Sequence, residues 1–229
     1  MSRIADPWSL PMLDDLLKRL GNISPHRICL IGPVGKATEK DVIRIQDHTN
    51  RNFELVEGTL VEKPVNQLES SLTMDLAGHL WSYLRDNPLG YLTGPDGGMR
   101  VLEKLVRMPD ISFIAWHQLP NRERCTEAIA PLSPALAVEV LSESNTREEM
   151  QLKRKEYFLG GTRLVWIVDP SKRTVEVWTS PDQCVTLTED QTLDGGDVLP
   201  GFRVSLRELF ANLPRLPARR GKSKRSGKK

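Results

Sequence analysis

Two carboxylates and one lysine of this chain have the residue types and spacing that metal-dependent phosphodiester cleavage requires. Asp110 opens an apolar strand in the segment MPDISFIAW, and Glu139 lies inside a second apolar strand, LAVEVLS. A carboxylate buried in such a strand is strongly unfavourable unless it is paired or binds a metal ion. Two carboxylates can hold Mg²⁺, and Lys153, on the helix that follows, could orient the attacking water and offset phosphate charge.

The helix expected over residues 145–159 determines which lysine can reach these acids. At 100° per residue, Met150 and Tyr157 share the face turned toward the sheet. Lys153 lies about 60° from Met150 and borders that face, whereas Lys155 lies about 140° away and is expected in solvent. Lys153 is therefore the candidate for an inward-pointing cation.

Each of the three residues also has a purely structural interpretation. Asp110 could cap a turn, Glu139 could form a buried ion pair with a core arginine, and Lys153 could extend along the helix edge into solvent. Two functional alternatives stay open as well. A metal-dependent hydrolase of another phosphate ester would use the same residues, and a catalytically inactive binding module would keep them as remnants.

Four segments carry a resemblance to a known family. They are FELVEGTLVEKP, MPDISFIAW, LAVEVLSESNTREEMQLKRKEYFLGGTRLVWIVDPSKRTVEVW and LDGGDVLPGFRVSLRELF. Over about residues 10–212 the chain resembles the Uma-type restriction endonucleases, a bacterial branch of the PD-(D/E)XK nuclease superfamily. The third segment is the most specific, because it contains the acid, the helix, the lysine and the tyrosine in order.

The resemblance implies an α/β, restriction-endonuclease-like fold with a mixed central β-sheet flanked by helices. It further implies a Mg²⁺-dependent endonuclease that acts on DNA, with Mn²⁺ as a substitute metal. By this likeness Asp110 and Glu139 bind the metal, the backbone carbonyl of Val140 is an additional ligand, and Lys153 is the catalytic lysine.

The chain departs from the family pattern at two places. The superfamily places a lysine two residues after the second acid, where this chain has Leu141; in the Uma-type branch the following helix carries it, as Lys153 does here. Many members also have a histidine on the helix after the first hairpin. The nearest polar residue here is Glu69, and Glu54 of the hairpin is a second candidate for a further site acid.

Hydrophobic periodicity predicts the elements that position these residues. We expect helices over 9–20, 36–47, 70–86 and 145–159, and β-hairpins over 53–64 and 163–180. The predicted organisation is an N-terminal helical extension packed on the body (1–50), a nuclease-like domain (51–213) and a disordered basic tail (214–229).

The charge is distributed unevenly along the chain. The tail 214–229 holds eight of the 32 basic residues and none of the 30 acidic ones, so the remaining 213 residues carry 24 basic and 30 acidic groups. A basic tail of this kind could contact phosphates weakly or serve only to keep the protein soluble.

Composition limits the compartment and the class of protein. No apolar run approaches the roughly 18 residues of a membrane span, and no secretory signal is recognisable at the N-terminus. Three well-separated cysteines, Cys29, Cys125 and Cys184, argue against a disulfide framework and against a structural zinc site. We therefore expect a cytoplasmic protein without membrane partners. A homodimer would suit an enzyme that cuts both DNA strands.

Overall fold

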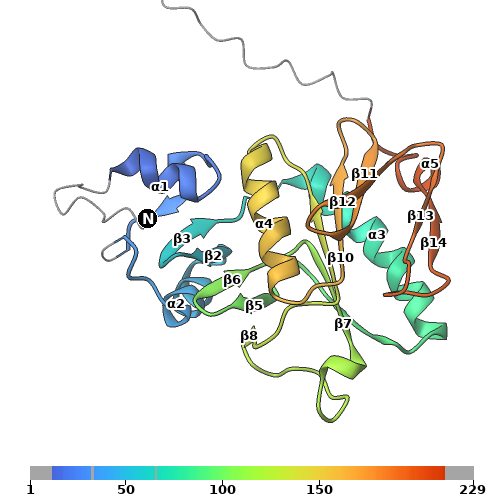
Figure 1. Ribbon diagram of the computed structural model, residues 1–229, viewed down its shortest axis with the longest axis horizontal. Coiled ribbons are helices and arrows are strands. Elements are labelled where there is room, and N and C mark those ends of the chain that lie inside the picture. The colour runs from blue at the N-terminus through green and yellow to red at the C-terminus, as the bar shows by residue number, and fades with distance from the viewer. Residues whose placement is uncertain (1–11, 32–33, 65, 215–229) are drawn as a thin grey trace, which may run out of the picture.

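The computed structural model describes residues 12–31, 34–64 and 66–214 (Figure 1). The basic tail predicted over 214–229 lies, from residue 215 onward, outside the described residues, as does the beginning of the helix predicted over 9–20.

Most strands of the described chain form two six-stranded sheets. The first has the order β1-β3-β2-β6-β5-β8, and its strands are β1 (Ile28–Cys29), β2 (Phe53–Val56), β3 (Thr59–Glu62), β5 (Gly98–Leu102), β6 (Leu105–Arg107) and β8 (Ile129–Ala130). The second has the order β12-β11-β10-β9-β7-β4, and its strands are β4 (Gly90–Thr93), β7 (Ile111–Ala115), β9 (Leu136–Val140), β10 (Leu164–Asp169), β11 (Thr174–Ser180) and β12 (Gln183–Thr188). Strands β13 (Thr192–Asp194) and β14 (Arg203–Ser205) form a separate pair.

Both large sheets are mixed. The pairs β9–β10 and β5–β8 are parallel, and the other strand pairs are antiparallel. The helices are α1 (Leu13–Arg19), α2 (Glu39–Thr49), α3 (Gln67–Asp86), α4 (Arg147–Leu159) and α5 (Leu206–Leu209), with short 3₁₀ turns at Pro25–Arg27 and Trp116–Gln118.

Helix α4 joins the two sheets. Its inward side chains Met150 and Tyr157 pack in one buried cluster with Val101 of the first sheet and Val165 of the second. In Figure 1 this helix crosses the centre of the molecule, with the first sheet on one side and the second on the other. Any side chain on the inner face of α4 therefore lies at the junction of the sheets.

Helices cover the remaining face of each sheet. Helix α2 packs Val42 and Ile45 on the first sheet. Helix α3 packs a stripe of leucines, together with α5 and the β13–β14 pair, on the second; the leucines are Leu72, Leu76, Leu80 and Leu84. Their four-residue spacing buries one side of the helix, as the periodicity predicted.

Two tight turns depend on left-handed backbone. Glu57 and Gly58 join β2 to β3 with φ of 48° and 69°, the double positive φ of a type I′ hairpin turn. Gly21, with φ of 81°, brings the end of α1 against α4, and a Cβ there would lie 2.5 Å from the Cα of Glu149. The described part of 1–50 therefore packs directly on the rest of the chain.

The predicted α/β class with a mixed sheet is confirmed, with one difference of detail. The strands expected in one central sheet divide between two sheets, because α4 occupies the space between them. None of the described helices combines the length and the apolar character needed to cross a lipid bilayer.

Candidate active site

Strand register brings Asp110 and Glu139 to the same end of the second sheet. Strand β7 starts directly after Asp110 and runs antiparallel to β9, with Ile111 opposite Val138. The Asp110 backbone N–H donates to the Val138 carbonyl at 2.9 Å. In return, the Val140 N–H donates to Oδ2 of Asp110 at 2.6 Å. Asp110 is thus held beside the strand that carries Glu139.

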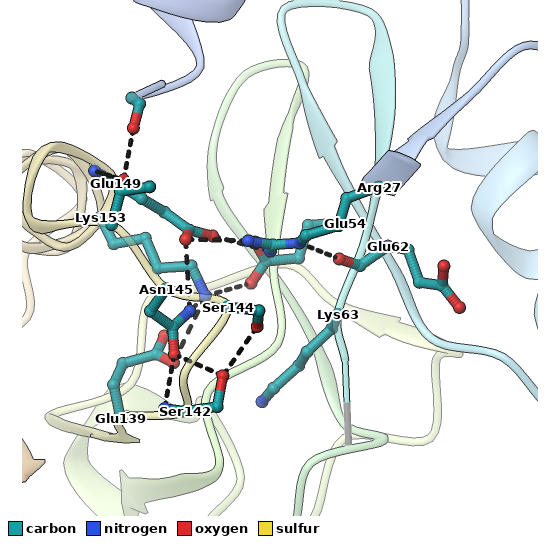
Figure 2. Close-up of polar contacts among 12 residues, drawn as sticks. Arg27, Glu54, Glu62, Lys63, Glu139, Ser142, Ser144, Asn145, Glu149 and Lys153 are labelled. Atoms are coloured by element: carbon teal, nitrogen blue, oxygen red, sulfur yellow. Dashed lines mark hydrogen bonds and ion pairs between the residues drawn. The ribbon is translucent and has the colours of Figure 1, made fainter. Parts of the chain in front are cut away.

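Lys153 reaches inward from α4 and lies between two glutamates. Its Nζ is 2.9 Å from Oε1 of Glu54 and 3.2 Å from Oε1 of Glu139 (Figure 2). One turn further along the helix, the Tyr157 hydroxyl donates to Oε1 of Glu139 at 2.6 Å. Lys153 is 2% exposed whereas Lys155 is exposed to solvent, so the predicted helical face is confirmed.

Burial and ion pairing together set the charge states in this cluster of Glu54, Glu139, Lys153 and Tyr157. Burial would raise the pKa of Glu54, but Lys153 and Arg107 outweigh it and hold the pKa well below its ordinary value. Burial raises the pKa of Glu139, and the positive charge of Lys153 offsets this rise only in part. Burial would lower the pKa of Lys153, but Glu139 and Glu54 raise it above the ordinary value, so this side chain is an ammonium. Burial and Glu139 raise the pKa of Tyr157 well above 10, which keeps its phenol a donor.

Arg107 of β6 supports the group from the first sheet. Its Nη1 lies 2.7 Å from Oε2 of Glu54, and its Nε lies 2.8 Å from Oε2 of Glu156 on α4. All three side chains are buried, with Arg107 2% exposed. Buried charges of this kind persist only when each has a partner, so Glu54 serves mainly to hold Lys153 and Arg107 in place.

A second buried pair ties the N-terminal segment to α4. Arg27 forms a bidentate contact with Glu149, at 2.9 and 2.7 Å. The Asn145 side-chain amide donates to Glu149 at 3.2 Å, and its Oδ1 accepts from the Ser142 N–H at 2.9 Å. The loop between β9 and α4 is thereby fixed next to Glu139, as Figure 2 shows.

Lys63 supplies a second ammonium to the site. It follows β3 directly, and its Nζ lies 2.8 Å from Oδ1 of Asp110 and donates to the Met108 carbonyl. The Lys63 side chain is 7% exposed and that of Asp110 is 15% exposed. Both oxygens of Asp110 therefore have a partner, Lys63 on one side and the Val140 N–H on the other.

A pocket of about 70 Å³ opens at this point. Asp110, Glu139, Val140, Lys153 and Lys63 all line it. Glu69, from the first turn of α3, lines it too, whereas Glu54 is buried behind Lys153 and does not. The pocket thus gathers the acids of two strands and one helix with two lysines.

The donor chemistry of the pocket fits Mg²⁺ as a partial ligand set. Among the described residues, no group of three or more His, Cys, Asp or Glu side chains is arranged to hold a metal ion. Mg²⁺ commonly takes only one or two carboxylates from the protein and completes its shell with water and substrate phosphate. Asp110 and Glu139 offer such oxygens, and the pocket has room for water.

The structure therefore brings together all the residues proposed from the sequence, although it separates Glu54 from the pocket itself. Sequence reasoning missed Lys63, Arg107, Arg27 and Glu149. Lys63 and Arg107 reach the site through the pairing of β2 with β3 and β6, and that pairing has no local signature. For Tyr157, the four-residue spacing from Lys153 was visible, but its bond to Glu139 was not.

Comparison with known proteins identifies relatives of this chain. A family model named Uma2, described as "Putative restriction endonuclease", matches residues 40–207. A crystal structure from Anabaena variabilis ATCC 29413, described as a "putative nuclease belonging to DUF820", superposes with a TM-score of 0.63 at 20% identity. That match covers 71% of this chain and 92% of the other, and at this identity it shows a shared fold. No curated protein matches.

Proposed function

Because the chain belongs to the Uma2 family of restriction-endonuclease-like proteins, we propose that it is a Mg²⁺-dependent endonuclease that hydrolyses phosphodiester bonds of DNA. The observation that supports this proposal most is the convergence of Asp110, Glu139, Lys153 and Lys63 on one pocket. Two carboxylates beside two ammonium groups suit a phosphate diester, which needs cations at its oxygens and a positioned water.

Asp110, Glu139 and the backbone carbonyl of Val140 would hold the metal ion, with Mn²⁺ as a substitute for Mg²⁺. When bound, such an ion polarises a phosphoryl oxygen and lowers the pKa of a water molecule. Asp110 suits this role because the Val140 N–H fixes one of its oxygens. Glu139 suits it because Tyr157 and Lys153 fix its carboxylate from the other side.

The two lysines have different tasks in this proposal. Lys153 is an ammonium at neutral pH, since its pKa is raised by Glu139 and Glu54 after the opposing effect of burial. It would therefore act as a cation that orients Glu139 and the attacking water and stabilises phosphate charge. Lys63 presents a second positive charge to the phosphate from the opposite wall of the pocket.

Partners and compartment belong to the same proposal. DNA is the proposed substrate, and the acidic body is compatible with it because a metal site is acidic and because residues 215–229 supply cations. We place the enzyme in the cytoplasm. A homodimer would allow both strands of a duplex to be cut.

A cleavage assay with matched variants tests the proposal. Wild type, Asp110→Asn and Glu139→Gln are incubated with plasmid DNA, RNA or p-nitrophenyl phosphate, in Mg²⁺, Mn²⁺ or EDTA. We expect DNA cleavage in either metal, none in EDTA, and at least a 100-fold loss in each variant. Hydrolysis of p-nitrophenyl phosphate alone would favour a phosphate-ester hydrolase, and binding without hydrolysis of any substrate would favour an inactive module.

A further inference from the structure

A second, larger pocket adjoins the site on the side of α4 that faces strands β10 and β11. We call it the α4–β11 groove; its volume is about 370 Å³. Arg147 and Arg154 line it from the helix, and Trp178 lines it from β11. Asn145 lines both this groove and the pocket of Asp110 and Glu139. A ligand that leaves the catalytic pocket past Asn145 would therefore enter the groove.

Arg154 is held in this groove without a counter-ion. Its guanidinium carbon lies 3.5 Å from the centre of the Trp178 ring, a stacked cation–π contact. Its Nε is buried and has no hydrogen-bond partner. Within the described chain, no carboxylate forms an ion pair with it. A stacked, half-buried guanidinium still carries N–H donors that an oxyanion can accept.

The acidic residues of the groove have partners other than Arg154. Asp169 is paired with Lys172 at 2.9 Å and also accepts from the Ser171 N–H. Glu176 accepts the indole N–H of Trp178 at 3.0 Å. Arg147, like Arg154, has no carboxylate partner in the part of the chain that the structure describes. The groove therefore presents two unmatched arginines.

The spacing of Arg147 and Arg154 allows each to contact a different phosphate. Arg147 and Arg154 are seven residues apart, so they lie on nearly the same face of α4 and about 10 Å apart along its axis. Phosphates recur every ~3.4 Å along the axis of each strand of a duplex, so two guanidinium groups about 10 Å apart can contact different phosphates of one strand.

We propose that the α4–β11 groove binds the phosphodiester backbone of the nucleic-acid substrate beyond the scissile phosphate. Arg154, kept flat by Trp178, is its main phosphate ligand, and Arg147 contacts a second phosphate of the strand. The proposal rests on the proposed nuclease function, because it assigns the path of that enzyme's substrate. It adds a binding subsite that lies outside the pocket of Asp110 and Glu139.

Binding in EDTA tests the subsite separately from cleavage. The dissociation constants of a fluorescein-labelled 20-mer, as a duplex and as a single strand, are measured by anisotropy from 50 to 300 mM KCl. We expect Arg154→Ala to weaken binding about tenfold and to make the slope of log K against log salt shallower by about one. Arg154→Lys keeps the charge but loses the planar fork and the stacking, so it should keep the slope and lose affinity.

A control arginine completes the design. Arg203→Ala removes the same charge at an exposed position of β14 that does not line the groove, so it should bind like wild type; thermal melting checks that each variant is folded. Unchanged affinity and slope for Arg154→Ala would overturn the subsite even if the enzyme cleaves DNA. A failure of the wild type to bind either 20-mer would also overturn it. If the salt dependence of binding changes in Arg154→Ala but the wild type cleaves no DNA, the binding subsite is supported and the proposed nuclease function is refuted.

Discussion

The Lys63 ammonium lies 2.8 Å from Oδ1 of Asp110, although the two residues flank strands of different sheets, β3 and β7, and both side chains are largely buried. Lys63 thus places a positive charge next to the carboxylate that we propose as a metal ligand. A divalent cation that binds Asp110 has to compete with this ammonium, because both need the same oxygen and like charges repel at short range.

Replacement of Lys63 by methionine is therefore expected to tighten metal binding. We predict an increase of about tenfold in the affinity for Mn²⁺, measured by calorimetric titration of the metal-free protein, since about 1.4 kcal/mol of repulsion corresponds to that factor. Lys172→Met is the matched control, because Lys172 is also paired with an aspartate at 2.9 Å but is exposed. Unchanged or weaker Mn²⁺ binding in Lys63→Met would contradict the competition.

Tyr157 is expected to act as a positioning residue for Glu139. Tyr157→Phe removes only the hydroxyl that donates to Glu139 at 2.6 Å. We predict a loss of about 1–2 kcal/mol of unfolding free energy, measured in urea, and about a tenfold lower cleavage rate. Tyr83→Phe deletes a hydroxyl that donates to the Pro200 carbonyl at 2.7 Å and should leave cleavage unchanged. Equal effects of both variants on cleavage would argue against a special role of Tyr157.

Alanine substitutions of the two lysines of α4 should have very different effects on stability. Lys153→Ala leaves Glu54 and Glu139 without their shared ammonium and should cost about 3–5 kcal/mol of stability, measured by urea unfolding. Lys155→Ala should change stability by less than about 0.5 kcal/mol. Adding Glu54→Gln to Lys153→Ala should restore part of the stability but no cleavage. Recovery of cleavage in that double variant would mean that Lys153 is only structural.

The buried pair of Arg27 and Glu149 predicts a dependence of stability on pH. Burial would raise the pKa of Glu149, but its hydrogen bonds to Arg27 hold the pKa below 4.5. The pair therefore stabilises the fold above that pH, and the contribution is lost as pH falls through the lowered pKa. Glu149→Gln should lower the unfolding free energy by about 3 kcal/mol at pH 7 and should flatten its decline below pH 5.

Exposed Glu148 provides the control for that measurement. Glu148→Gln removes the same charge one residue earlier on α4 and should keep the acid-dependent decline of the wild type. If Glu149→Gln and Glu148→Gln have the same unfolding free energy at pH 7 and at pH 4, the buried pair makes no net contribution.

The sequence was sufficient for those parts of the site that depend on local periodicity. The helical face of Lys153 follows from 3.6 residues per turn, and an acid inside an apolar strand marks Glu139 as unusual without any structure. The division of the strands between two sheets could not be predicted, because it depends on where α4 packs. The contacts of Lys63 and Arg107 could not be predicted either, since each joins residues at least 40 positions apart in the chain.

The different positions of Glu54 and Glu69 also could not be predicted from the sequence. Both were candidates for a further site acid, and only the tertiary structure separates them. Glu54 is fully buried against Lys153 and Arg107, whereas Glu69 lines the pocket. Hydrophobic pattern alone cannot distinguish these positions, because it does not show that Glu54 lies in a strand buried at all four positions while Glu69 lies in the first turn of an amphipathic helix.

The most direct test of the metal site is a calorimetric titration of Mn²⁺ into wild type and into the double variant Asp110→Asn/Glu139→Gln. It is run with and without a phosphorothioate oligonucleotide, which can complete the ligand shell without rapid cleavage. We predict saturable binding to the wild type, tighter with the oligonucleotide, and no binding to the variant under either condition. Equal Mn²⁺ binding by both proteins, or none by wild type even with the oligonucleotide, would contradict a metal-dependent nuclease centred on Asp110 and Glu139.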